Sequence, residues 1–142
     1  MAACPTIDPR LAELVEDFEL LGGWEEQIGY VIDLGRTLPP LSEAERSEAN
    51  KVRGCASQVW LAMEREGERL SFRGDSDSPL VKGLIAVLAR LYSGAPAAEI
   101  VDFDVKAAFD KLGLAGSLTA QRSNGLASMV ARIRETASAV AA

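Results

Sequence analysis

The sequence predicts an α+β fold, in which a small antiparallel β-sheet packs against several helices. Residues 57–65 and 70–74 alternate apolar and polar side chains on either side of Gly67, the pattern of a β-hairpin. The segments before and after the hairpin instead repeat apolar residues at helical spacing. With 142 residues and 48% hydrophobic content, the chain can bury one core, so we expect a single domain over residues 1–142, with 1–10 and 140–142 flexible.

Two helices are expected before the hairpin. The first starts at Asp8, which we expect to be the N-cap, and its apolar residues recur up to a glycine pair at 22–23. The second runs from residue 24 to about 37 and is stopped by the following Leu-Pro-Pro. Ser42 and Glu45 have the spacing of a capping box on a short helical turn. A polar loop then leads into Cys55.

Four helices are expected after the hairpin. They cover residues 79–93, 96–101, 104–112 and about 120–139, with Asp104 as a cap and glycines at 94 and 113 as stop signals. The first of them is the most apolar, so we expect it at the centre of the fold. A third strand is plausible, although no segment has the pattern of one.

Composition narrows the function classes. The net charge of −6 and the pI near 4.7 argue against nucleic-acid binding, which needs clustered Lys and Arg. No apolar run is long enough for a membrane helix and the N-terminus lacks the features of a signal peptide, so we expect a cytoplasmic protein. The chain has two cysteines and no histidine, which excludes a Cys-His dyad, a Ser-His-Asp triad and a four-thiolate iron–sulfur site within one chain.

Cys55 is the strongest candidate for chemistry. It lies between a loop and the first predicted strand, where Gly54 allows a tight turn and the segment from Ser57 onwards anchors the far side. The cations Lys51 and Arg53 are close in sequence and favour a thiolate if they approach the sulfur. The alternative is a buried structural cysteine, which is a common role for a free thiol. Cys4, in the N-terminal segment, has no supporting context.

Two further segments have weaker signals. The acidic run at residues 74–79 could serve acid–base or metal chemistry, but we favour a hydrogen-bonded helix entry with its acids near a helix N-terminus. Arg122 stands near the start of the last helix, where a solvated surface residue is the simpler interpretation. No phosphate-binding loop or dinucleotide motif occurs in the sequence.

Four blocks along the chain nevertheless resemble one family. They are WEEQIGYVIDLGRTLPPL from residue 24, NKVRGCASQVW from residue 50, RGDSDSPLVKGLIAVL from residue 73 and LTAQRSNGLASMV from residue 118. In order and spacing they resemble the SufE family, and together they cover most of residues 11–137. The resemblance implies a SufE/IscU-like α+β domain.

The resemblance also implies a function. SufE proteins accept sulfur from a pyridoxal-phosphate cysteine desulfurase of the SufS type, stimulate it and pass the sulfur to an iron–sulfur scaffold such as SufBCD. Cys55 matches the acceptor cysteine, which makes the chain a sulfurtransferase-like persulfide carrier with no cofactor or metal of its own. Arg122 matches an arginine near the acceptor, and Asp77 matches a loop beside it that could tune the loop, contact the partner and cap the helix. Supporting roles are expected for Gly54, Ser57 and Gln58. A monomer and a homodimer both remain open.

Three other functions compete with sulfur transfer. A cluster scaffold of the IscU type needs three or more converging ligands, which one cysteine without histidine does not supply. A peroxidase or hydrolase lacks a resolving thiol of known geometry and a histidine base. A non-catalytic adaptor with a structural Cys55 is the main alternative, and it would keep desulfurase stimulation in a Cys55→Ser variant.

Overall fold

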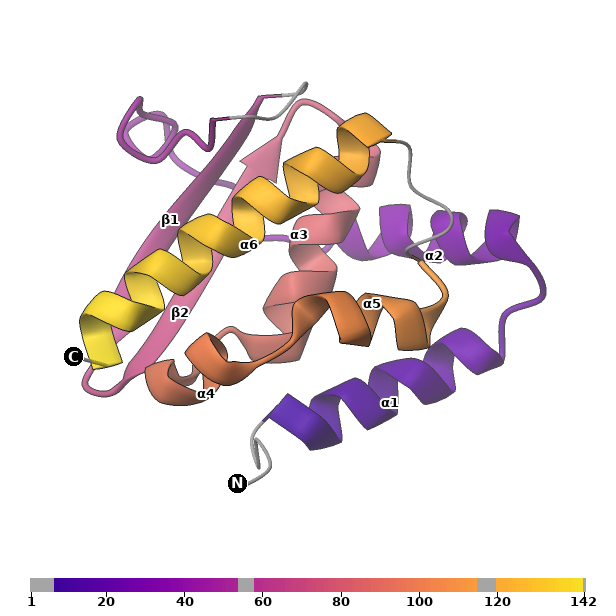
Figure 1. Ribbon diagram of the computed structural model, residues 1–142. Coiled ribbons are helices and arrows are strands. Elements are labelled where there is room, and N and C mark those ends of the chain that lie inside the picture. The colour runs from indigo at the N-terminus through magenta and orange to yellow at the C-terminus, as the bar shows by residue number, and fades with distance from the viewer. Residues whose placement is uncertain (1–6, 54–57, 115–119, 142) are drawn as a thin grey trace.

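The computed structural model describes residues 7–53, 58–114 and 120–141, apart from the side chains of residues 24 and 120–123. The chain order is two helices, a β-hairpin, a central helix, a short third strand and three more helices (Figure 1). This confirms the predicted α+β fold with an antiparallel sheet. The elements are α1 (Ile7–Glu19), α2 (Trp24–Gly35), β1 (Val59–Glu66), β2 (Arg69–Ser76), α3 (Pro79–Tyr92), β3 (Ala95–Pro96), α4 (Ala97–Asp102), α5 (Val105–Leu112) and α6 (Ala120–Ala141).

The sheet has the strand order β1-β2-β3, with both neighbouring pairs antiparallel. Within the hairpin Val59 faces Ser76 and Leu61 faces Gly74, so the predicted alternation sets which side chains are buried. Gly67 forms the turn with a φ of 63°, a value that favours glycine because it has no Cβ. The two-residue β3 was not identifiable from the sequence, because two residues are too few to show alternation.

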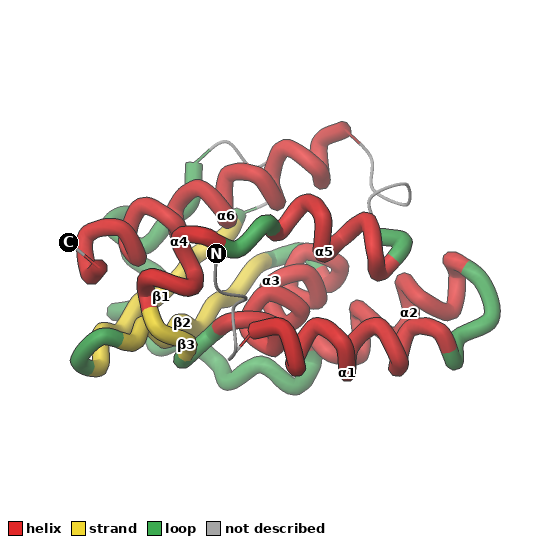
Figure 2. The backbone as a smooth tube through the Cα atoms, turned by 60° about the horizontal axis from the view of Figure 1, so that its bottom comes forward, coloured by secondary structure: helices red, strands yellow, loops and turns green. Residues whose placement is uncertain are grey.

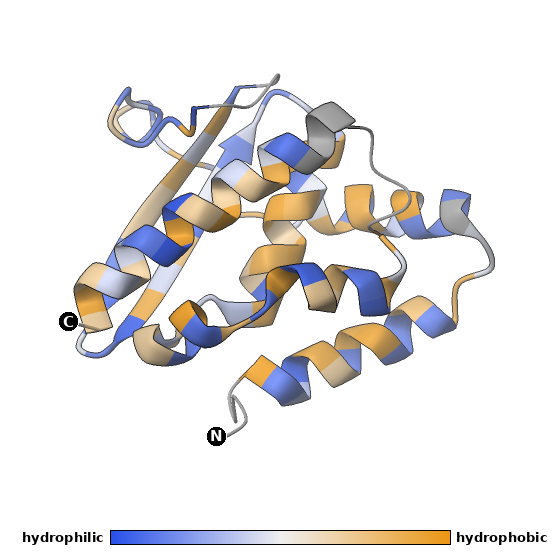
Figure 3. Cartoon of the chain, in the orientation of Figure 1, coloured by the Kyte–Doolittle hydropathy of each residue, from blue (hydrophilic) through white to orange (hydrophobic). Residues whose placement is uncertain are grey.

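Helix α3 lies in the middle of the molecule, between the sheet and the first two helices (Figures 1 and 2). Ten of its 14 residues are buried, and the apolar colouring follows it in Figure 3. This confirms the expectation that it is the central helix. Helices α4, α5 and α6 form a separate layer, in which α6 crosses the sheet and contacts β1 and β2 (Figures 1 and 2). A single hydrophobic cluster includes residues from all of these layers.

The predicted end signals are mostly confirmed. Helix α3 begins at Pro79 as expected, Asp104 caps α5 by accepting a hydrogen bond from the Ala107 amide at 3.0 Å, and Gly113 ends α5 with a φ of 76°. One prediction was wrong: Asp8 is not an N-cap, because α1 already begins at Ile7, whose side chain is fully buried. A buried apolar contact extends this helix beyond the start that the Asp-Pro pair indicates.

Candidate functional site

Cys55, Gly54 and Ser57 lie outside the described residues, so the structure describes the two ends of their segment. The Val52 amide donates to the Val59 carbonyl at 2.8 Å, and the Leu61 amide donates to the Asn50 carbonyl at 2.9 Å. The chain therefore enters and leaves this segment side by side, with residues 50–52 paired antiparallel to the start of β1. Val52 and Val59 are both buried, which fixes the two ends on the hydrophobic core.

Asp77 holds the exit from the segment. Its Oδ1 atom accepts a hydrogen bond from the Gln58 amide at 3.0 Å, and its own amide donates to the Gln58 carbonyl at 3.3 Å. The carboxylate thus contacts the residue three positions after Cys55. The expectation that Asp77 caps the following helix was wrong: Ser78 is the N-cap of α3, and its hydroxyl accepts from the Val81 amide. The expectation of a hydrogen-bonded helix entry is confirmed.

Residues 42–52, which we call the strap, lead into the segment from the other side. Ser42 and Glu45 exchange reciprocal hydrogen bonds between backbone amide and side chain, so the predicted capping box exists, although it closes a turn and not a helix. Two ion pairs then tie the strap to β2. The Glu45 carboxylate pairs with the Arg73 guanidinium, and Arg46 donates twice to Asp75 Oδ2, at 3.1 and 2.6 Å.

These ion pairs set the charge state of the strap. Burial by itself raises the pKa of the Asp75 carboxyl, but hydrogen bonds from Arg46 and the Ser76 amide, with the charge of Lys82, hold that pKa below its ordinary value. The hydrogen bond from Arg73 likewise lowers the pKa of Glu45. Both carboxylates therefore stay ionised to a lower pH than free carboxyl groups do, and their ion pairs with Arg73 and Arg46 persist over the same range.

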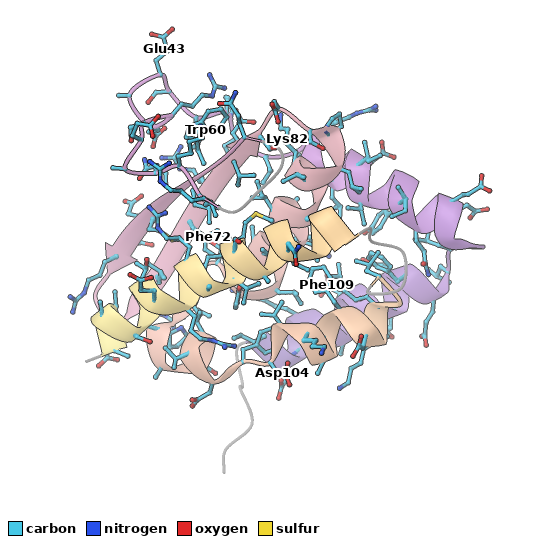
Figure 4. The ribbon with its side chains drawn as sticks, turned by 45° about the horizontal axis from the view of Figure 1, so that its top comes forward. Glu43, Trp60, Phe72, Lys82, Asp104 and Phe109 are labelled. Atoms are coloured by element: carbon cyan, nitrogen blue, oxygen red, sulfur yellow. The ribbon has the colours of Figure 1, made fainter. Side chains whose placement is uncertain are left out.

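A small pocket adjoins Asp77 between the end of α2 and the start of α3. Its volume is about 240 Å³, and its lining residues are Ile32, Gly35, Arg36, Ser76, Asp77, Pro79 and Lys82. Trp60 and Lys82 lie at the same end of the molecule (Figure 4). Arg36 pairs with Asp33, Lys82 shares Asp75 with Arg46, and Asp77 adds a further carboxylate to the lining. The pocket is therefore mixed in charge and not an anion site.

The remaining candidates are placed only in part. The backbone of Arg122 belongs to the first turn of α6, and its side chain lies outside the described part of the chain. The start of α6 lies at the same end of the molecule as the start of β1 and the β2–α3 turn (Figure 1). Arg53 forms an exposed ion pair with Glu48. Among the described residues, no three His, Cys, Asp or Glu side chains gather as a metal site.

The family model for SufE, described as an Fe-S metabolism associated domain, matches residues 12–137. The chain belongs to the SufE family. It is therefore associated with iron–sulfur metabolism. This SufE-family chain is 49% identical over 136 residues to an uncharacterized SufE-like protein of Rhizobium etli, covering 93% of this chain and 92% of the relative. It is 44% identical over 131 residues to another from Rhizobium meliloti, covering 89% and 94%.

The fold has a counterpart among solved structures. The solution structure of a hypothetical protein from Thermus thermophilus matches the SufE-family chain with a TM-score of 0.77, covering 93% of this chain and 96% of the other. Its sequence identity is 19%, so this likeness concerns the fold alone. Within the described residues, no helix combines the length and the apolar character that crossing a membrane requires.

Sequence reasoning named Cys55, Asp77 and Gln58 as candidates, of which the structure describes Asp77 and Gln58 in contact, but it missed the strap. The two ion pairs that hold the strap join residues about 30 positions apart in the sequence. Neither pair produces a pattern among neighbouring residues that would predict it. A partial signal was present in β2, where Arg73 and Asp75 alternate with Phe72 and Gly74 and so share the face opposite the core. Opposite charges on one strand face can pair with complementary charges on a neighbouring segment, as Arg73 and Asp75 do with Glu45 and Arg46.

Proposed function

We propose that this protein accepts sulfur on Cys55 from the active-site persulfide of a SufS-type cysteine desulfurase and thereby stimulates that enzyme. The observation that carries the proposal is the family match across residues 12–137, which includes the segment GCASQVW around Cys55. The paired ends at Val52 and Val59 and the Asp77–Gln58 contact support it, because they restrict where a thiol between them can lie.

The transfer is a thiol–persulfide exchange. The Cys55 thiolate attacks the outer sulfur of the partner's Cys–S–SH group, a new S–S bond forms at Cys55, and the bond to the partner's cysteine breaks with that cysteine leaving as a thiolate. The step needs no external oxidant or reductant, because sulfur moves with its oxidation state unchanged. It needs no histidine once the thiol is ionised, which agrees with a chain that has none.

The proposal also includes the recipient of the sulfur, the cellular compartment and a supporting residue. The sulfur would pass to an iron–sulfur scaffold of the SufBCD type, in a reducing cytoplasm where a free thiol persists. Residues 1–142 would act as one domain, and Arg122 would stabilise the charge of the thiolate or persulfide. Nucleic acid and membranes have no part in it.

Intact mass spectrometry tests the proposal directly. The protein is incubated with a SufS-type desulfurase and free cysteine, as wild type, as Cys55→Ser and as Cys4→Ser. We expect a reducible gain of sulfur in wild type and Cys4→Ser that is absent in Cys55→Ser, with desulfurase turnover stimulated in the same two proteins. Stimulation that survives in Cys55→Ser would instead support the adaptor role.

A further inference from the structure

Arg132, in the middle of α6, donates to the backbone of the strap. Its Nη1 atom donates to the Lys51 carbonyl at 3.1 Å, and its Nη2 atom donates to the Ala49 carbonyl. The carbonyl between them, that of Asn50, accepts instead from the Leu61 amide of β1. Three successive carbonyls of the strap thus accept hydrogen bonds in alternation from α6 and from β1, as the carbonyls of a strand do when it has a neighbour on each edge. The guanidinium occupies the place of the second neighbouring strand.

The strap needs such a partner, because its pairing with the sheet is short. The contact with β1 is one bridge, Lys51 with Trp60, carried by two backbone hydrogen bonds. So short a ladder is marginal without further support. The ion pairs of Glu45 and Arg46 hold only the far end of the strap.

Close to Cys55, the side-chain contacts differ in strength. The pair between Arg53 and Glu48 is exposed, with 77% of each side chain accessible, so it contributes little. Arg132 is half-buried, and the two terminal nitrogens of its guanidinium donate to two backbone carbonyls on the same side of the strap. Lysine does not reproduce this geometry. Val52 packs its side chain into the core, and of the described side-chain hydrogen bonds and ion pairs close before Cys55, the one from Arg132 to Lys51 is therefore the strongest.

We infer that Arg132 is a positioning residue for sulfur transfer, which fixes the strap against β1 so that Cys55 meets the persulfide of a docked desulfurase in one orientation. The inference rests on the proposed function and adds a residue that the sequence did not single out. Orientation of the thiol matters after the partners have docked. Loss of Arg132 therefore slows the transfer step more than it weakens docking.

The matched control is Arg134, two residues further along the same helix. Arg134 also donates to a backbone carbonyl, that of Phe103 at 3.0 Å, but this carbonyl belongs to the α4–α5 connection. Arg132→Ala and Arg134→Ala lose the same charge and the same kind of hydrogen bond, and alanine favours the helix in both. Arg132→Lys keeps the charge and can reach one carbonyl but not both.

The experiment measures single-turnover sulfur uptake by intact mass across a range of desulfurase concentrations. For Arg132→Ala we expect the maximal rate to fall about five- to tenfold, as for the net loss of one typical hydrogen bond, while the half-saturating concentration changes less than about twofold. Arg132→Lys should lie between this variant and wild type, and Arg134→Ala should match wild type. Hydrogen exchange at the Val52 and Leu61 amides should accelerate only in the Arg132 variants.

The outcomes separate the two proposals. Uptake by wild type with no difference in Arg132→Ala, or an equal loss in Arg134→Ala, overturns the positioning role and leaves the proposed function standing. A loss confined to the half-saturating concentration also overturns it, because it assigns Arg132 to docking. No uptake by wild type overturns the proposed function, and a positioning role in sulfur transfer with it.

Discussion

Helices α2 and α3 cross closely at one glycine from each helix. The variant Gly83→Ala tests how closely they approach. A Cβ added at Gly83 would lie 2.6 Å from Val31 Cγ1 and would also clash with the Val31 carbonyl oxygen. At Gly35 an added Cβ would lie 2.6 Å from the Gly83 amide nitrogen. Much of the opposing surface is backbone, which does not rotate away as a side-chain tip does. The helices would have to separate by roughly 1 Å to restore ordinary contact.

The expected cost follows from two opposing terms. Overpacking a close-packed contact costs about 2–3 kcal/mol, and replacing a helical glycine with alanine returns about 1 kcal/mol. We therefore expect Gly83→Ala to lose about 1–2 kcal/mol of unfolding free energy. Gly29→Ala is the matched control, because Gly29 lies in α2 with nothing within 4 Å of an added Cβ. It should gain up to about 1 kcal/mol.

Urea unfolding followed by circular dichroism at pH 7 measures both variants. The difference between them isolates the clash, because the gain in helix propensity is common to both, and it should be about 2–3 kcal/mol. If Gly83→Ala is as stable as Gly29→Ala, the helices do not approach as closely as described and the reasoning fails.

Three further predictions follow from single contacts. The Tyr92 hydroxyl is buried with no hydrogen-bond partner among the described residues, so Tyr92→Phe should be neutral or stabilise by up to about 1 kcal/mol in urea unfolding; a clear loss would reveal an overlooked partner. The pKa of Asp75 is lowered in the folded state. Its contribution to the free energy of unfolding is therefore fully present above the pKa of the unfolded state, about 3.9, and is lost as the pH falls through the pKa of the folded state. Asp75→Asn should thus cost about 2 kcal/mol at pH 7, a deficit that shrinks below about pH 4; a deficit constant down to pH 2 would contradict the ion pair with Arg46. Gly67→Ala should cost about 1 kcal/mol through backbone strain alone, since nothing lies within 4 Å of the added Cβ, and an unchanged urea midpoint would refute the positive φ.

The sequence predicted what depends on neighbours along the chain. The alternation through Val59 and Leu61 identified β1, and the cap at Asp104 identified the start of α5, because each signal lies within a few residues. The strap, the short β3 and the role of Asp77 as a partner of Gln58 depend on contacts between distant segments. No local pattern encodes such contacts, and the burial of Ile7 that extends α1 belongs to the same class.

The Arg132 contact also bears on how the protein is completed during synthesis. The residues that it joins are 81 positions apart, from Lys51 to Arg132. Domains generally fold as units, and the single core includes Met129 and Ile133 of α6, so the core cannot be completed on the ribosome before α6 has been made. The strap would receive its last anchor only when almost the whole chain has emerged. A nascent or truncated chain that lacks α6 would thus carry Cys55 beside a strap without its Arg132 contact.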